Sequence, residues 1–244
     1  MDLHIHTVLS PCGDWEMSPK KIIERVKELG LGVIGITDHH TVENYPAVAF
    51  WGEKRGVVVI PGMEIQTKEE VHVVALFKDY NKSLMFQKEL WKYLPENKNN
   101  EDLFGVQVVV NENEEVERIE DRLLLTSVNL SLEEVTKLIR EFEGIIVLAH
   151  VNKPSFSVLS NLGFIPENLD FDFIELTEVN NIEDFIRSNI ILNNSRNRLI
   201  VSSDAHYIND IRIPRSFINI ERLTIESAFF CLKNKYVKIG EMEV

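Results

Sequence analysis

The stretch Met1-Asp2-Leu3-His4-Ile5-His6-Thr7 sets the expectation for both the fold and the functional site. Two histidines stand two positions apart in an apolar, strand-like run. Side chains alternate between the faces of a strand, so His4 and His6 should share one face. Leu3 and Ile5 should face the other way. Two imidazoles directed at one point from a rigid strand would form half of a metal site, although an isolated pair is equally often a surface feature.

The composition is that of a globular protein with an acidic surface. The chain has 244 residues, of which 44% are hydrophobic and 27% charged, and its formal net charge is −13. This length suffices for a single-domain α/β barrel. The negative charge argues against binding to long nucleic acids or to a membrane surface, because like charges repel. A small phosphorylated substrate remains compatible, since bound cations would dominate the local field.

Cysteine usage and hydropathy indicate a cytoplasmic protein. Cys12 and Cys231 are the two cysteines, and their separation predicts no disulfide framework. The first strand begins at Met1, which leaves no room for a signal peptide. No apolar run approaches the roughly 18 residues of a membrane helix. We therefore expect a soluble cytoplasmic protein, while its oligomeric state stays open.

Short β-rich segments alternate with helical segments along most of the chain. After the opening stretch, the expected strands are residues 33–37, 57–60, 71–77, 145–149, 171–176 and 199–202, and the expected helices are residues 19–30, 47–55, 82–94, 131–142, 183–193 and 224–232. This alternation is typical of βαβ units. We predict an α/β fold, a TIM-like (β/α)7 barrel with its site at the C-terminal ends of the strands.

Residues 95–130 interrupt this alternation. They contain a polar break at 95–102, an extended segment at 106–110 and an acidic segment at 112–121. The region is too short for a core of its own. We therefore expect an insertion, either a solvated surface, a lid or a partner surface, on one domain that spans residues 1–244.

The histidines lie in or directly after apolar, strand-like runs. This holds for His4, His6, His39, His40, His72, His150 and His206, and Asp204 lies two residues before the last of them. At one edge of a barrel most of these side chains would converge, whereas His72 begins its strand rather than ending it. Imidazole and carboxylate together suit zinc, manganese or iron. Glu64, in a loop between two strands, is the candidate to bridge two cations, and His40 is expected to be structural.

These motifs resemble those of the PHP family, the polymerase and histidinol phosphatase domain. The matching segments are Asp2-Leu3-His4-Ile5-His6-Thr7, Thr37-Asp38-His39, Gly62-Met63-Glu64-Ile65, Val71-His72-Val73, Ala149-His150 and Ser203-Asp204-Ala205-His206. The resemblance extends over nearly the whole chain and is least certain at 95–130. It implies a distorted barrel of seven strands, a cluster of two or three divalent metals, and hydrolysis of phosphate esters.

The resemblance also implies three metal positions. The first would use His4, His6, Glu64 and Asp204, the second Glu64, His72 and His150, and the third His39, His206 and one ligand from the loop after His6. This loop is longer than the usual family pattern. Asp14 is our choice because it stands five residues before Pro19, while Cys12 and Glu16 remain open.

The implied reaction is attack at phosphorus. Two cations generate a bridging hydroxide at neutral pH and stabilise an in-line displacement, with Glu64, Asp204 and His206 as the expected catalytic residues. The substrate would be a small phosphomonoester, or a nucleotide or cyclic phosphodiester. Lys153, Arg212 and Arg215 follow metal motifs in sequence and are candidates to bind its phosphate.

Two alternatives from other classes remain. One is a metal-dependent amidohydrolase that attacks a C–N bond, although no lysine stands in a strand-end ligand context. The other is a non-catalytic, metal-stabilised regulatory module, against which the apparently full set of ligands counts.

Overall fold

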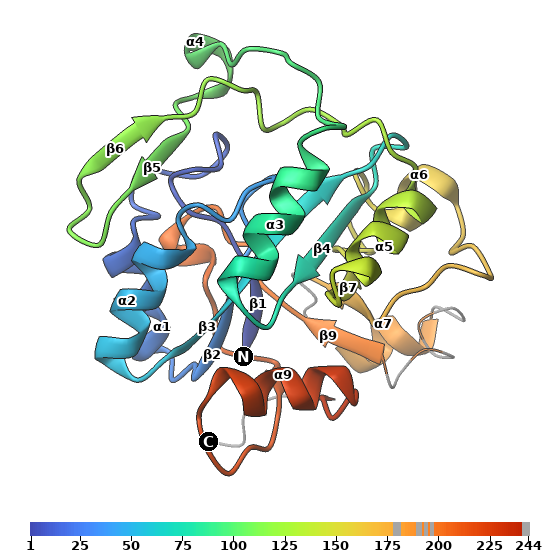
Figure 1. Ribbon diagram of the computed structural model, residues 1–244. Coiled ribbons are helices and arrows are strands. Elements are labelled where there is room, and N and C mark those ends of the chain that lie inside the picture. Colours follow the sequence, from blue (N-terminus) through green and yellow to red (C-terminus); the bar gives the residue numbers. More distant parts are fainter. Residues whose placement is uncertain (178–181, 189–191, 193–194, 196–197, 241–244) are drawn as a thin grey trace.

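The computed structural model describes residues 1–177, 182–188, 192, 195 and 198–240. Within these residues a seven-stranded sheet in the order β1-β2-β3-β4-β7-β8-β9 curls into a barrel (Figure 1). The strands are β1 (Asp2–Ile5), β2 (Val33–Ile36), β3 (Val58–Gln66), β4 (His72–Leu76), β7 (Ile145–Leu148), β8 (Phe173–Leu176) and β9 (Leu199–Val201). The predicted barrel-like α/β fold is confirmed.

One strand departs from the expected parallel arrangement. β4 pairs antiparallel with both β3 and β7, whereas the other neighbouring strands of the barrel are parallel. A short turn joins β3 to β4, so Gln66 at the end of β3 pairs with His72 at the start of β4. The start of a reversed strand lies at the same edge as the ends of its parallel neighbours. This explains why His72 begins its strand and still reaches the common edge.

The barrel closes where β9 meets β1. Past the end of β9, Ala205 forms an isolated parallel bridge with Ile5. The His6 backbone N–H donates to the Ala205 carbonyl at 3.0 Å, and the Ala205 N–H donates to the His4 carbonyl at 3.3 Å. We call this junction the β1/β9 seam. It brings the first and the last sequence motifs into direct contact.

The expectation that Leu3 and Ile5 share a face is wrong. Leu3 packs with apolar residues drawn from all seven strands, which fill the barrel interior, whereas Ile5 packs with α1 and α2 on the outside. The cause is a shift in the pairing register of β1 with β2 between Asp2 and Ile5. This irregularity interrupts the simple alternation of the strand.

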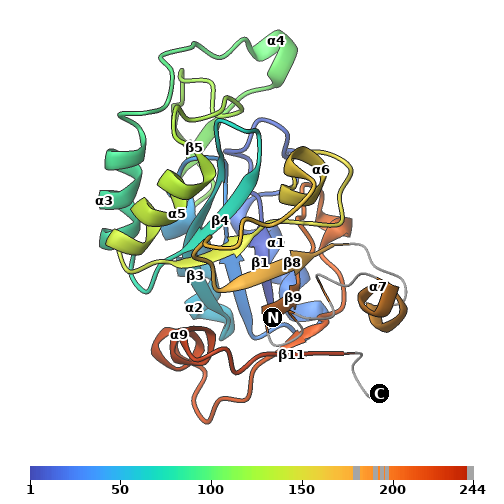
Figure 2. The same cartoon turned by 90° about the vertical axis from the view of Figure 1, so that its right-hand side faces the viewer.

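Helices cover the outside of the barrel and one of its ends (Figures 1 and 2). They are α1 (Pro19–Glu28), α2 (Tyr45–Arg55), α3 (Tyr80–Leu90), α5 (Leu132–Glu141), α6 (Val158–Leu162), α7 (Ile182–Ser188) and α9 (Ile225–Lys233). α5 begins with the expected capping box of Ser131 and Glu134. The helix expected at 183–193 corresponds to α7, and several of its later residues lie outside the described part. α9 adds Phe229 and Leu232 to the interior cluster and covers the end of the barrel near Met1.

The 95–130 region adds a small hairpin beside the barrel. It contains α4 (Glu101–Phe104), β5 (Val108–Val110) and β6 (Val116–Ile119). The Asn44 side chain donates to the Val108 carbonyl and accepts from the Val110 N–H, each at 3.0 Å. The hairpin is therefore fixed to the start of α2. A single domain over 1–244 stays a prediction.

The described chain is completed by short elements, β10 (Ser216–Phe217), which pairs with β11 (Lys238–Ile239), and a 3₁₀ turn, η2 (Ile208–Asp210). Among the described residues, no helix combines the length and the apolar character that crossing a membrane would require.

Candidate metal centre

Hydrogen bonds fix the orientation of the two histidines of the first motif. His4 Nδ1 lies 3.0 and 3.2 Å from the two carboxylate oxygens of Glu175, so Nδ1 carries the proton. Ser10 Oγ donates to Asp38 at 2.6 Å, and His6 Nδ1 therefore donates to Ser10 Oγ at 2.8 Å. The Nε2 atom of each ring is therefore the one that can bind a metal. The two Nε2 atoms lie 3.2 Å apart.

Two carboxylates complete this first group. Asp204 Oδ1 lies 3.2 Å from His4 Nε2 and 3.3 Å from His6 Nε2, and Glu64 Oε1 lies 3.3 Å from His4 Nε2. The Asp204 oxygen is buried and forms no hydrogen bond to the described residues. Four buried acceptor groups converge, although electron pairs that face one another repel. A cation would remove this repulsion, so these donors fit a metal ion.

A second group also gathers around Glu64. Its Oε1 lies 2.7 Å from His72 Nδ1 and 3.0 Å from His150 Nε2. His72 Nε2 is 3.2 Å from Gln66 Oε1, an acceptor, so the proton of His72 sits on Nε2 and its Nδ1 is available. The structure thus brings together Glu64, His72 and His150, the group that the family resemblance implies.

The third group differs from the expectation in one member. Nitrogen atoms of His6, His39 and His206 lie within 4.8 Å of one another. His206 Nδ1 donates to the Asp204 carbonyl at 3.0 Å, which leaves its Nε2 available. Asp14 is absent from the three described groups, and His6 stands where a loop ligand was expected.

The loop after His6 uses its polar residues for its own structure. The Asp14 N–H donates to the His206 carbonyl at 2.8 Å, and Asp14 Oδ1 accepts from the Glu16 N–H at 2.8 Å. The Glu16 carboxylate pairs with Lys21 at 2.9 Å. Cys12 is exposed and belongs to none of the three described groups. Asp14 therefore ties the loop to the last motif.

Charges within the centre prepare its groups for metal binding. Burial lowers the pKa of His6 to about 3, so this imidazole is neutral at pH 7. Burial also lowers the pKa of His39 well below its ordinary value. Burial alone would raise the pKa of Glu64, but the neighbouring histidines His72, His4 and His39 outweigh it and hold that pKa well below its ordinary value. Neutral imidazole and ionised carboxylate are the forms that bind metals.

His4 differs from the other histidines. Burial opposes its imidazolium form, yet the carboxylates of Glu175, Asp204 and Glu64 outweigh burial and raise its pKa well above the ordinary value. Three anions around one ring describe a site with excess negative charge. A divalent cation in place of the proton would balance this charge.

Left-handed backbone conformations occur at the ends of the motifs. His40, His150 and Asp204 have φ values of 56°, 30° and 52°. Such values are uncommon for residues other than glycine and cluster at functional sites. In this chain they turn the backbone two to four residues after the ends of β2, β7 and β9, and two of these residues are candidate ligands.

The candidates for substrate binding separate into two places. Lys153 Nζ lies 2.5 Å from Asp204 Oδ2, beside the proposed ligands, and its side chain is 38% exposed. The charge of Asp204 outweighs partial burial and raises the pKa of Lys153. Arg212 and Arg215 instead line a separate cavity, and no proposed metal ligand is among the residues of its wall.

Sequence reasoning gave no role to Glu175, which orients two candidate ligands. Besides its bonds to His4, its Oε1 accepts from the His150 backbone N–H at 3.1 Å. A fully buried glutamate in the apolar strand β8 was the available signal. Ser10 and Asp38 form the corresponding support for His6.

Solved structures show where this fold occurs. A lesion-specific endonuclease from Pyrococcus furiosus superposes with a TM-score of 0.67 and 23% identity, over 98% of this chain and 56% of that one. Endonuclease Q bound to a 27-mer duplex with an abasic lesion gives the same TM-score at 22% identity, over 98% and 57% of the two chains. An amidohydrolase from Chromobacterium violaceum matches with a TM-score of 0.58 and 16% identity, over 98% of this chain and 97% of that one. At these identities the similarity shows the fold alone.

Sequence comparison leads to the family. The 5'-3' exoribonuclease Rnm of Salmonella typhimurium is 36% identical over 80 residues, which cover 31% of this chain and 26% of the relative. The match thus spans about a quarter of that relative's length. The sequence model of the PHP domain matches residues 2–165, which include the first five of the six motifs described above. The chain therefore belongs to the PHP domain family.

Proposed function

We propose that this PHP domain is a metal-dependent hydrolase of phosphate esters that uses two or three divalent cations. The observation that carries the proposal is the position of Glu64. Its Oε1 lies within 3.3 Å of His4 Nε2, His72 Nδ1 and His150 Nε2. Its Oε2 lies 3.2 Å from His39 Nδ1 and 3.5 Å from His6 Nε2. One buried carboxylate thus contacts nitrogen donors of all three groups, as a bridging ligand would.

The three groups suggest which residues would hold each cation. His4, His6, Glu64 and Asp204 would hold one cation, Glu64, His72 and His150 a second, and His6, His39 and His206 a third. Zinc, manganese or iron suits nitrogen and oxygen ligands of this kind. When bound, such cations activate water and stabilise negative charge at phosphorus.

The substrate would enter beside Lys153. Its ammonium contacts Asp204, and its partly exposed position leaves N–H donors for a phosphate oxygen. The ammonium would hold the phosphate next to the proposed ligands. Asp204 contacts Lys153, and His206 Nδ1 lies 3.7 Å from Asp204 Oδ1. These two residues are therefore the proposed catalytic residues together with Glu64.

The size of the substrate follows from charge. A net charge of −13 disfavours a long polyanion, which supports a small phosphomonoester, a nucleotide or a cyclic diester. Two similar proteins are nevertheless named as nucleases, so short oligonucleotides should be among the substrates tested. The fold shared with an amidohydrolase adds simple amides to the same panel.

The test compares Glu64→Gln with Glu167→Gln, a matched change of an exposed glutamate. Loss of the charge at Glu64 should release or displace one cation and lower turnover of the best ester by two or more orders of magnitude. Glu167→Gln should behave as the wild type. Metal content and steady-state kinetics are measured on the same samples. Normal turnover with full metal content in Glu64→Gln would exclude the bridging role.

Lys153→Ala separates binding from chemistry within the same experiment. If the ammonium contacts the phosphate equally in the ground and transition states, KM should rise while kcat stays close to the wild-type value. Lys153→Arg should restore much of the lost affinity, because it retains the positive charge. A fall in kcat with unchanged KM would assign Lys153 to the chemical step instead.

A further inference from the structure

An exposed aromatic ring lies at the edge of the proposed metal centre. It belongs to Phe156, in the loop of residues 149–157 that joins β7 to α6, and this residue is 40% exposed. The Phe156 ring stacks on the imidazole of His72, with the two centroids 4.9 Å apart and the planes inclined by 22°. His72 Nδ1 lies 2.7 Å from Glu64 Oε1. One imidazole thus contacts both Phe156 and the carboxylate that is proposed to bridge the cations.

Packing in the protein core does not account for the position of Phe156. The residue belongs to none of the three apolar clusters that the described residues form. Its φ of 56° is uncommon for a bulky side chain and costs free energy. Residues in such conformations cluster at active sites and at ligand contacts. An exposed phenylalanine in this conformation, stacked on a proposed metal ligand, indicates a role in binding.

Hydrogen bonds hold the loop of Phe156 in place. The His72 N–H donates to the Phe156 carbonyl at 2.9 Å. Ser157 Oγ donates to the Lys153 carbonyl at 3.0 Å, which closes the loop on itself. Asn161, in α6, donates to two carbonyls of the turn between β3 and β4, at 3.0 and 2.9 Å. The backbone that carries the ring is therefore fixed before any ligand binds.

The same loop supplies a cation. Lys153 stands three residues before Phe156, and its ammonium lies 2.5 Å from Asp204 Oδ2. Asp204 belongs to the first proposed group of ligands and His72 to the second. Lys153 and Phe156 therefore contact the centre at two of its groups. A ligand that used both side chains would carry a phosphate and a planar ring.

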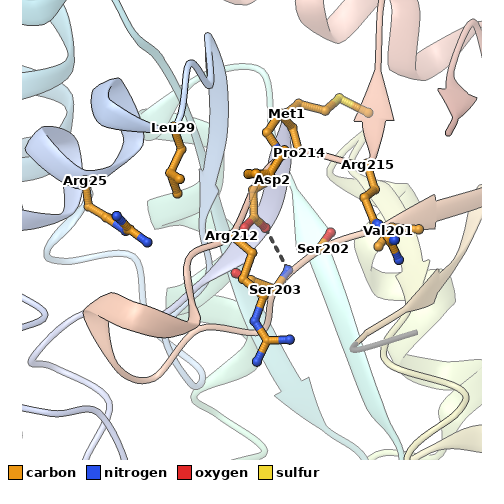
Figure 3. A pocket seen from close by; sticks show the side chains of 11 residues that line it. Met1, Asp2, Arg25, Leu29, Val201, Ser202, Ser203, Arg212, Pro214 and Arg215 are labelled. Atoms are coloured by element: carbon orange, nitrogen blue, oxygen red, sulfur yellow. Dashed lines mark hydrogen bonds between the residues drawn. The ribbon is translucent and has the colours of Figure 1, made fainter. Parts of the chain in front are cut away.

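The cavity shown in Figure 3 is a different place. It lies beside the β1/β9 seam, and neither Lys153 nor Phe156 is among the residues of its wall. The proposed metal ligands are also absent from that wall. The organic part of a substrate whose phosphate lies at the metal centre is therefore expected at Phe156 and not in this cavity.

We propose that Phe156 binds the base of a nucleoside phosphate by stacking, while Lys153 and the metal centre hold the phosphate. This inference rests on the proposed function, because the phosphate would occupy the same centre. Every nucleobase has a flat π-face, and loss of one stacking ring typically weakens binding about 10- to 100-fold. Stacking depends little on which base is present. Phe156 would therefore select nucleotides over phosphate esters without an aromatic group.

The test measures binding to the zinc-loaded protein, so its outcome does not depend on turnover. The ligands are non-hydrolysable phosphonate analogues of adenosine monophosphate and of ribose 5-phosphate, which differ by the base. Calorimetry should show that the wild type binds the adenosine analogue at least tenfold more tightly. In Phe156→Leu, which keeps an apolar side chain but lacks the ring, this preference should fall below threefold. Affinity for the ribose analogue should stay within twofold.

Two further variants provide the controls. Phe156→Trp should retain the preference for the adenosine analogue, because indole also stacks on bases. Phe164→Leu is the matched change of an exposed phenylalanine beyond the end of α6, and it should leave both affinities within twofold. A free nucleotide and the end of an oligonucleotide offer the same base and phosphate. Tighter binding of a dinucleotide analogue than of the mononucleotide would identify the oligonucleotide, and equal or weaker binding the free nucleotide.

The outcomes that overturn this inference differ from failure of the proposed function. Equal binding of the two analogues by the wild type, or no binding of either, would overturn the role of Phe156. So would a full preference in Phe156→Leu. A similar loss of affinity for both analogues in this variant would show that the ring only supports His72. Absence of hydrolysis for every ester tested, with the preference intact, would instead overturn the proposed reaction and leave the stacking role standing.

Discussion

Glu175 shows how much of the proposed centre depends on residues that would touch no metal. Its carboxylate holds the His4 ring through Nδ1 and the His150 backbone through its N–H. Carboxylates in this position fix the tautomer of a ligating histidine and increase its basicity. A single buried side chain thus orients ligands of two different groups.

Glu175→Gln should weaken metal binding without unfolding the chain. The amide can still accept from His4, but it lacks the negative charge, and loss of such a partner typically lowers metal affinity about 10- to 100-fold. Competition with a coloured chelator measures this affinity. Glu167→Gln serves as the exposed control, and wild-type affinity in Glu175→Gln would show that the carboxylate does not support the centre.

His40 provides a test of acid sensitivity. Burial lowers its pKa from 6.5 to about 3. Below pH 6.5 the imidazole is therefore protonated in the unfolded chain but stays neutral in the folded protein. Stability is therefore lost as the pH falls from about 6.5 toward 3, and this one group contributes about 2 kcal/mol of the loss by pH 5. Its positive φ is tolerated by asparagine.

His40→Asn should accordingly reduce the difference in the free energy of unfolding between pH 7 and pH 5 by about 2 kcal/mol. Urea unfolding of the wild type and the variant at both pH values measures this difference, whatever the stability at pH 7. An unchanged pH dependence would mean that His40 is protonated in the folded protein.

The sequence predicts some residues of the centre and misses others for physical reasons. His4 lies in an apolar strand, His39 and His150 follow such strands, and parallel strands end at a common edge, so their proximity can be inferred without coordinates. Glu175 has no such signal, because its partner His4 is distant in sequence. The prediction of Asp14 rests only on its spacing from Pro19. The position of His6 between two groups depends on the register shift in β1, which sequence spacing does not reveal.

At the scale of elements, close contact between β1 and β2 positions the first histidine pair. A Cβ on Gly35 would lie 2.6 Å from the Leu3 carbonyl oxygen and 3.1 Å from its Cα. These are backbone atoms and cannot rotate away. The absence of a side chain at Gly35 therefore permits the spacing that brings His4 to the centre.

Gly35→Ala should displace β1, lower stability by about 1–3 kcal/mol and weaken metal binding at the same time. Gly32→Ala is the matched control, because its Cβ would meet only Leu223 side-chain atoms, at 3.4 Å or more. Thermal melting and metal competition are measured for both variants. Loss of stability with unchanged metal affinity would show that β1 and the centre are not coupled.

The direction of β4 could not be predicted from hydropathy alone. The hydropathy pattern of residues 71–77 fits a parallel and an antiparallel strand equally well, because it does not depend on the direction of the strand. The short connection from Gln66 to His72 is compatible only with a hairpin, since a parallel crossover needs about a dozen residues. The position of His72 at the start of its strand was the second signal of this reversal.

The proposed ligands connect β1 and β9, the two edge strands of the barrel sheet, with the strands between them. His4 lies in β1 and His6 directly after it, and Asp204 follows β9. Glu64 lies in β3 rather than in the loop expected from the sequence. Metal bound at these residues would hold the β1/β9 seam, where the described backbone contacts are few. Binding to the folded state alone stabilises it by mass action.

Removal of metal by a chelator should therefore lower the melting temperature reversibly, by roughly 10 °C if the free metal exceeds its Kd about 1,000-fold. Calorimetry before chelation, after it and after restoration of zinc or manganese measures this shift. Hydrogen exchange should localise the loosened amides to Ile5, His6 and Ala205. An identical melting curve in protein shown to be free of metal would contradict the proposed centre.

The seam also orders events during synthesis. Glu64, His72 and His150 are all present once residue 150 has left the ribosome. The group that contains His4 is incomplete until Asp204 has also been made. At 5–20 residues per second this interval lasts roughly 3 to 11 seconds. A nascent chain would thus hold one complete group of ligands while His4 and His6 still lack their C-terminal partner. During those seconds β1 remains an open edge that another chain can pair with.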